Sequence, residues 1–138
     1  MAASARAGAP AARMRWRALE WPAWLRRVAA GVYLALLTAA LLAPPSTFED
    51  AGQLFTHQDK VVHLAMFLAL AVLARWSLPA EGGRRPAAAA ALVVYATAIE
   101  ALQPALTAGQ RTFEWADLAC NAAGVSAGWM LFPRLTAR

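Results

Sequence analysis

Residues 61–78 read VVHLAMFLALAVLARWSL, an eighteen-residue stretch whose only full charge is on Arg75. Such a stretch is typical of a helix that crosses a bilayer, because about 17–25 apolar residues span the roughly 30 Å hydrocarbon core. Three further apolar runs occupy 28–43, 87–106 and 116–132, and proline or glycine lies between successive runs. The sequence therefore predicts an all-α fold, an integral membrane four-helix bundle.

The composition of the whole chain agrees with this prediction. Of its 138 residues, 60% are hydrophobic and 15% are charged, with a mean hydropathy of +0.43. A soluble domain is about 45–50% apolar and about 25% charged. Four spans leave little room for a soluble catalytic domain, which excludes most cofactor folds. The net charge of +5 indicates the lipid bilayer as the first partner and no nucleic acid.

The cations are distributed unevenly between the two ends of the predicted spans. Lys and Arg near span ends are retained on the cytoplasmic side. Only Lys60 and Arg111 lie on one side, against eleven arginines on the other. This places the N and C termini in the cytoplasm and the loops 44–60 and 107–115 outside. The eleven are Arg6, Arg13, Arg15, Arg17, Arg26, Arg27, Arg75, Arg84, Arg85, Arg134 and Arg138.

Two parts of the chain are distinguished by composition. Residues 1–25 are interpreted as a basic, disordered cytoplasmic tail, and residues 26–134 as a four-helix transmembrane domain. A cleaved signal peptide is an alternative for the run 28–43, although no clean small-x-small site follows it. The spacing of Ser46 and Glu49 predicts a short helix over residues 47–54.

Polar side chains interrupt the apolar runs at one common depth. A charged residue at mid-helix costs roughly 2.5–3.5 kcal/mol, so such positions need a reason. With a rise of about 1.5 Å per residue, the polar groups of the last three runs all fall in the outer third of the bilayer, near Arg111. We therefore expect a polar pocket that opens outward. Its predicted ligand-binding residues are Asp59, His63, Glu100, Gln103, Arg111, Asp117 and Asn121.

The ionisable members of this set are expected to carry its chemistry. Glu100 should be either protonated or paired, and Arg111 is the nearest cation, unless Arg111 holds an anionic ligand instead. Asp59 precedes His63 by one turn, so it could orient the imidazole or cap the helix. Asp59 and Lys60 both lie near the interface, where an alternative is that they are simply solvated. The candidate catalytic residues are His63, Glu100 and Asp117.

Other polar and small residues have structural interpretations. Gln103 and Asn121 could simply fasten helices together, since amides between membrane helices contribute about 0.6–2 kcal/mol each. Gly124 and Gly128 form a small-xxx-small face, which favours a close helix contact or a homo-oligomer. Arg75 is expected to extend to the cytoplasmic headgroups.

Several motifs with known chemistry are absent from the sequence. There is no phosphate-binding Gly-rich loop, no G-x-S-x-G nucleophile elbow and no His-x-x-x-His pair. The single cysteine, Cys120, excludes an internal disulfide. His57 and His63 could supply metal ligands together with Asp59, Glu100 or Asp117, but their spacing matches no standard zinc pattern. The sequence therefore predicts no metal site and no cofactor, and metal binding is kept as an alternative.

The polar positions also carry a resemblance to the VanZ-like family of small bacterial membrane proteins, over about residues 28–132. Two departures from its usual pattern are Pro104, directly after Gln103, and Met66-Phe67, where an aromatic pair with Tyr is more usual. The resemblance implies a multi-spanning protein of the bacterial plasma membrane. The family's namesake is linked to resistance to the glycopeptide teicoplanin. The matching pieces are Asp59-Lys60-Val61-Val62-His63, Glu100-Ala101-Leu102-Gln103, Arg111 with Asp117 six residues later, and Asn121 with Gly124.

Three functional hypotheses follow. In the first, the outward pocket binds a lipid-linked or other anionic envelope component, with Arg111 as its anion anchor. In the second, the protein is a membrane enzyme in which His63 or Glu100 performs acid-base chemistry on a lipid headgroup. In the third, it is a structural or partner-binding membrane protein whose polar residues only fasten helices.

Overall fold

The computed structural model describes residues 21–44, 46–47, 56–79 and 84–136, and for residues 133–136 it describes the backbone alone. These residues form four α-helices: α1 (Ala23–Leu42), α2 (Gln58–Ser77), α3 (Arg84–Leu106) and α4 (Trp115–Thr136). α3 and α4 contain their predicted apolar runs whole, and α1 and α2 contain theirs except for the last residue. The all-α, four-helix prediction is therefore confirmed for the described chain. Of the predicted short helix 47–54, only Thr47 lies within the described residues, and the tail up to residue 20 lies outside them.

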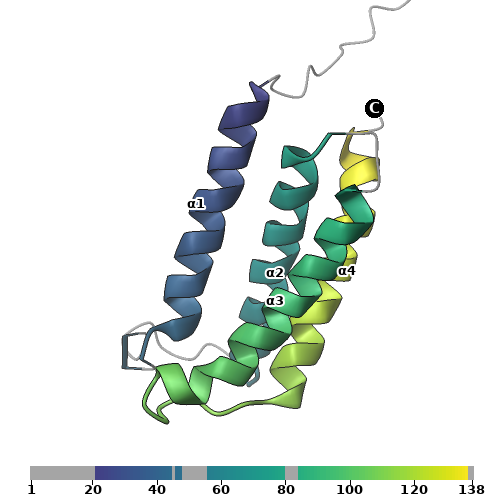
Figure 1. The fold of residues 1–138 in the computed structure, drawn as a ribbon. Coiled ribbons are helices and arrows are strands. Elements are labelled where there is room, and N and C mark those ends of the chain that lie inside the picture. Colours follow the sequence, from purple (N-terminus) through teal and green to yellow (C-terminus); the bar gives the residue numbers. More distant parts are fainter. Residues whose placement is uncertain (1–20, 45, 48–55, 80–83, 137–138) are drawn as a thin grey trace, which may run out of the picture.

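Proline and positive-φ residues define the helix ends. Pro22 precedes α1, and Pro44 and Pro79 closely follow α1 and α2, where their missing N–H cannot continue a helix. After α3 the chain turns through Ala108 and Gly109, whose φ angles are 52° and 78°. Pro104 lies inside α3, which continues for two more residues and leans towards α1 at this end (Figure 1).

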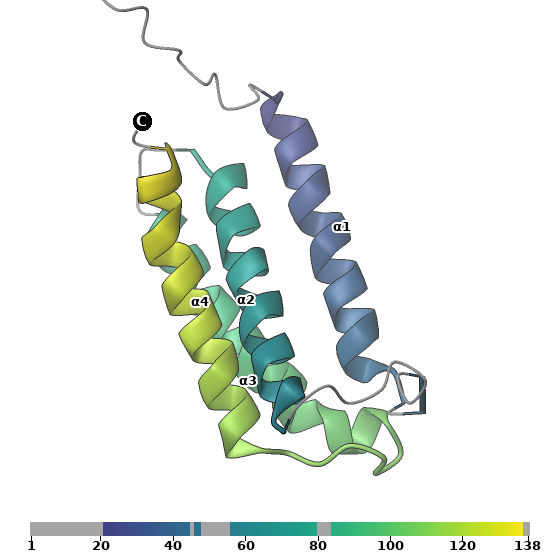
Figure 2. The same ribbon diagram turned by 180° about the vertical axis from the view of Figure 1, so that it is seen from behind.

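The four helices run alternately up and down. α1 and α3 end where α2 and α4 begin, and we call this the site end of the bundle; it lies at the bottom of Figure 1. α1 stands at one edge of the bundle beside α2, as both views show (Figures 1 and 2). The most extensive contact is between α2 and α4.

Two glycines allow α2 and α4 to approach closely. A Cβ atom at Gly124 would overlap the carbonyl oxygen of Leu64, and one at Gly128 would overlap that of Leu68. The close helix contact that their spacing predicts is therefore made within the chain. A homo-oligomer stays a prediction. Because α2 covers Gly124 and Gly128, an oligomer interface would have to use another face of the bundle.

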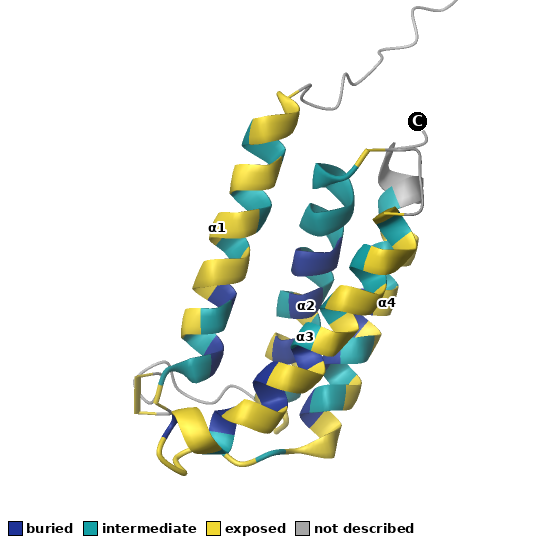
Figure 3. Ribbon diagram, in the orientation of Figure 1, coloured by how far each residue is buried: buried dark blue, intermediate teal, exposed yellow. Residues whose placement is uncertain are grey.

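The buried core lies mostly towards the site end. Figure 3 shows exposed residues along most of α1 and buried residues gathered lower in the bundle. Large apolar side chains such as Val32, Leu36, Val94 and Met130 are exposed, as expected of helices whose outer faces contact lipid. The core residues are Leu37, Leu41, Phe67, Leu70, Ala71, Ala96, Ile99 and Val125.

Three of these helices, α1, α2 and α3, are long and apolar enough to cross a membrane. α4 is equally long, with 22 residues, but Asp117 and Asn121 lower its apolarity. That all four helices cross the membrane therefore remains a prediction, and three of them are long and apolar enough to do so.

The described cations separate to opposite ends of the bundle. Lys60 and Arg111 lie at the site end, and Arg26, Arg27, Arg75, Arg84 and Arg85 lie at the other. This agrees with the charge asymmetry of the sequence, while the membrane side that each end faces stays a prediction.

Arg75 does not extend away from the bundle as expected. Its Nη1 donates a hydrogen bond to the carbonyl oxygen of Trp129, and its guanidinium lies 5.3 Å from the centroid of that ring. The Trp129 indole of α4 is its cation–π partner, so Arg75 joins α2 to α4.

Candidate functional site

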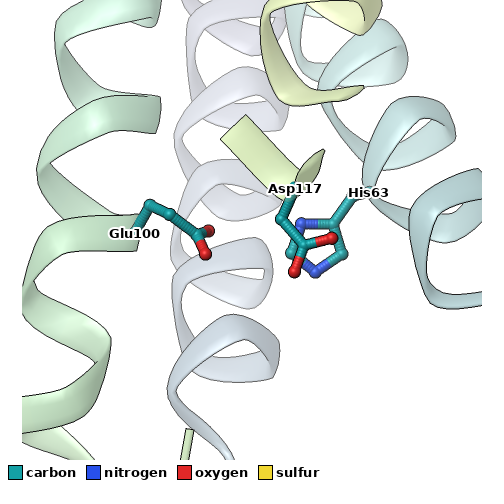
Figure 4. Close-up of side chains that lie close together, drawn as sticks. All are labelled: His63, Glu100 and Asp117. Atoms are coloured by element: carbon teal, nitrogen blue, oxygen red, sulfur yellow. The ribbon is translucent and has the colours of Figure 1, made fainter. Parts of the chain in front are cut away.

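Three buried ionisable side chains from three different helices converge at the site end. His63 of α2, Glu100 of α3 and Asp117 of α4 are 6%, 0% and 9% exposed. Their candidate ligand atoms all lie within 4.8 Å of one another. Figure 4 shows the Glu100 carboxylate directed towards the imidazole and the carboxylate of the other two. The sequence placed these three groups at one depth, and the structure brings them together.

Helix geometry explains why further polar residues join them. Lys60 precedes His63 by three residues, Gln103 follows Glu100 by three, and Asn121 follows Asp117 by four. Residues with this spacing share a helix face, so each helix presents two neighbouring polar groups to the same region. Gln103 and Asn121 are both buried, at 2% and 0% exposure.

The imidazole of His63 is held by Asn121. Nδ1 of His63 lies 3.0 Å from Oδ1 of Asn121 in a buried contact between α2 and α4. Orientation by Asp59, which the sequence suggested, is not observed, because Asp59 pairs with Lys60 instead. Asp59 is not the helix cap either: the N-cap position of α2 is His57, and Asp59 lies in the first turn.

Lys60 is the central cation of the site. Its Nζ lies 2.9 Å from Oδ2 of Asp59, 2.5 Å from Oε2 of Glu114 and 2.6 Å from Oδ1 of Asp117. Only 17% of the Lys60 side chain is exposed, so Lys60 is paired rather than simply solvated, whereas the Asp59 side chain is 57% exposed. Carboxylates of α4 and of the loop before it offer better partners than water once α2 and α4 are packed. Glu114 was not among the predicted residues, although it lies one turn before Asp117.

Glu100 does not pair with Arg111. Oε1 of Glu100 accepts a hydrogen bond from the backbone N–H of Glu114 at 3.2 Å, and Oε2 is buried without a hydrogen-bond partner among the described residues. Arg111 donates from Nε to the carbonyl oxygen of Ala43, at the end of α1, over 3.0 Å. The predicted pair is absent because the loop after α3 directs Arg111 towards α1.

The buried amide of Gln103 fastens helices together. Its Nε2 donates to the carbonyl oxygen of Leu41 at 3.1 Å, which joins α3 to α1. Thr107, which the sequence reasoning missed, donates from Oγ1 to the carbonyl oxygen of Gln103 at 2.6 Å. Thr107 Oγ1 also accepts the backbone N–H of Arg111 at 3.1 Å and so holds the start of the loop.

Comparison with known proteins identifies the family. A family model described as VanZ/LLP1 matches residues 16–136. The chain belongs to the VanZ/LLP1 family. No curated protein and no solved structure matches the chain. Family membership and three span-competent helices together indicate a VanZ-like membrane protein.

The site of this VanZ-like protein is rich in negative charge. Three carboxyl groups, those of Asp59, Glu114 and Asp117, surround the ammonium group of Lys60, and a fourth, that of Glu100, lies within 4.8 Å of a carboxylate oxygen of Asp117. Two of the four, Glu100 and Asp117, are buried. Side chains that titrate so close together in a buried region can hold a cation, exchange a proton or bind a polar group of a ligand.

Proposed function

We propose that this VanZ-like membrane protein binds the polar part of a lipid-linked or other anionic envelope component at its site end. We further propose that such binding is the basis of any link to resistance against glycopeptides such as teicoplanin. The observation that carries the proposal is Glu100, which is fully buried and keeps one carboxylate oxygen without a hydrogen-bond partner among the described residues.

A purely structural role explains the amides better than it explains Glu100. Gln103 bonds to α1 and Asn121 bonds to α2, which is how polar residues fasten membrane helices. Glu100 makes one long hydrogen bond to the backbone of Glu114. A carboxyl group is expensive in this environment and apolar packing could replace such a weak contact, so a functional role is favoured.

Arg111 is suited to contact the anionic part of the ligand. In the described part of the chain its only side-chain hydrogen bond uses Nε, and the side chain is half-buried beside the end of α1. A guanidinium group has five N–H donors in a planar fork, which matches phosphate and carboxylate groups. It lies at the same end of the bundle as the buried cluster, so we propose that one ligand contacts both.

The direction in which the site end faces supports an envelope ligand. Five described arginines lie at the opposite end, which the positive-inside rule assigns to the cytoplasm. The site end is then extracytoplasmic, where lipid-linked envelope precursors and glycopeptides meet.

The test compares Arg111→Gln with Arg84→Gln in a glycopeptide-susceptible host that expresses the protein. Both variants remove one positive charge, but Arg84 lies at the far end of the bundle, and glutamine at 111 can still donate to the Ala43 carbonyl. We expect Arg111→Gln alone to lose the co-purifying envelope lipid, detected by mass spectrometry, and any rise in the teicoplanin inhibitory concentration. Equal behaviour of the two variants would overturn the proposal.

A membrane enzyme is the second candidate, because His63 lies close to two carboxyl groups. An imidazole oriented by Asn121 beside Glu100 and Asp117 has the components of a general acid-base pair. This candidate requires turnover of a lipid headgroup in purified membranes. Turnover that survives His63→Gln would remove the proposed base.

A further inference from the structure

Two groups of potential metal ligands meet at Asp117. One contains Asp59, Glu114 and Asp117, and the other contains His63, Glu100 and Asp117. The first group already surrounds a cation, because all three carboxylates lie 2.5–2.9 Å from Nζ of Lys60. Among the described residues, neither His63 nor Glu100 has such a cationic partner. In the second group only Asp117 is therefore paired with a cation, Lys60, while Glu100 lacks one.

The unsatisfied oxygen of Glu100 belongs to this second group. Oε2 is buried, the side chain is 0% exposed, and the carboxylate is directed towards His63 and Asp117 (Figure 4). Leaving such an oxygen without a partner costs about 1–3 kcal/mol, and more when the group is charged. A cation bound between the three side chains would satisfy it.

His63 has the orientation of a metal-binding imidazole. The amide oxygen of Asn121 can only accept a hydrogen bond, so Nδ1 of His63, 3.0 Å away, is the donor. In the neutral imidazole with this tautomer, Nε2 keeps its lone pair for a metal ion. Histidines that bind metals almost always donate their other N–H to a carbonyl or carboxylate oxygen in this way, which fixes the ring.

We propose that His63, Glu100 and Asp117 bind a divalent metal ion, and that Zn²⁺ is the ion that fits best. One imidazole nitrogen and two carboxylate oxygens are ligands that Zn²⁺ accepts, whereas Mg²⁺ and Ca²⁺ prefer oxygen alone. Bonds of about 2.0–2.2 Å place tetrahedral ligands about 3.4 Å apart. Ligand atoms already within 4.8 Å reach this arrangement by small side-chain rotations.

The metal site extends the proposed function, and the biological role of the ion rests on that function. A divalent cation offsets the negative charge of Glu100 and Asp117, which would otherwise repel an anionic ligand. Three protein ligands also leave a fourth position, where a water molecule or a phosphate oxygen of the ligand can bind. Arg111 and the metal ion would then contact one anionic group from two sides.

The experiment uses the full chain, purified in mild detergent without chelator and after removal of any histidine tag. Metal content per chain is measured by inductively coupled plasma mass spectrometry. The stripped protein is then titrated with Zn²⁺ in a calorimeter, with Mg²⁺ as the comparison ion. The variants are Glu100→Gln and His63→Gln, and the control is Arg84→Gln, which changes the net charge by one unit, as Glu100→Gln does, but lies at the far end of the bundle.

We expect one Zn²⁺ per chain in the wild type, and binding weakened by more than about tenfold in both site variants, since even residues outside the ligand set alter metal affinity by 10–100-fold. Arg84→Gln should bind as the wild type does. The proposal is overturned if the wild type binds no Zn²⁺ at micromolar concentration, if a folded site variant binds normally, or if Arg84→Gln loses binding equally. Circular dichroism in metal-free buffer checks that each variant is folded. If Glu100→Gln does not fold, the Zn²⁺ affinity of His63→Gln decides the test.

The two proposals can fail separately. Arg111→Gln should lose the envelope ligand and keep Zn²⁺. A wild type that binds Zn²⁺ but no envelope component contradicts the proposed function alone. A wild type that binds the component without metal contradicts the metal site alone.

Discussion

Lys60 is expected to stabilise the fold mainly through Asp117, although its ammonium group contacts three carboxylates. Asp59 and Glu114 have side chains that are 57% and 49% exposed, and pairs with such exposed partners contribute about 0–1 kcal/mol each. The Asp117 side chain is 13% exposed and that of Lys60 is 17% exposed. Removing one member of a buried pair costs about 3–5 kcal/mol, because the other charge is left uncompensated.

A double-mutant cycle tests this assignment. Lys60→Met should lower the free energy of unfolding by about 3–5 kcal/mol, whereas Asp59→Asn should lower it by less than about 1 kcal/mol. Lys60→Met combined with Asp117→Leu should recover most of the loss, because an apolar pair replaces an ion pair at little cost. The measurement is unfolding by sodium dodecyl sulfate in mixed micelles, with chelator present so that no metal contributes. If Lys60→Met costs no more than Asp59→Asn, or the double variant is additive, the reasoning is refuted.

Two further predictions concern helix packing and topology. Gly124→Ala should destabilise the protein by about 1–3 kcal/mol, because the new Cβ overlaps the Leu64 carbonyl oxygen, whereas Gly31→Ala in α1 meets nothing within 4 Å and should be neutral or slightly stabilising in the same titration. Equal shifts would show that the α2–α4 approach is not limited by Gly124. An alkaline phosphatase fusion at residue 109 should be active outside the cell membrane and one at residue 83 inactive, and the reverse pattern would contradict the orientation inferred from charge.

The helices were predictable because their signals are local. The run 61–78 became α2, Gln58–Ser77, and the run 87–106 became α3, Arg84–Leu106. Apolar length, proline and glycine set these bounds without reference to the rest of the chain. The helices begin one to five residues before the predicted runs, since polar residues such as Gln58 and Arg84 also fit the first turn of a helix that ends at a membrane surface.

The common depth of the polar groups was predictable for the same reason. A rise of about 1.5 Å per residue converts sequence position into height, so His63, Glu100 and Asp117 could be placed at one level before any packing was known. Spacing motifs could not indicate a metal site, because its three proposed ligands come from three helices.

The sequence by itself therefore determined the helical elements, their alternating direction and the level at which the polar groups gather, because these follow from apolar run length, the loops between runs and the rise per residue. Only the tertiary structure decided which groups touch. The glycines of α4 bring it against α2, which places Lys60 beside Asp117 and His63 beside Asn121, while the turn at Gly109 sends Arg111 to Ala43 instead of Glu100. These contacts depend on the rotation and separation of neighbouring helices, and no periodicity along a single helix encodes either quantity.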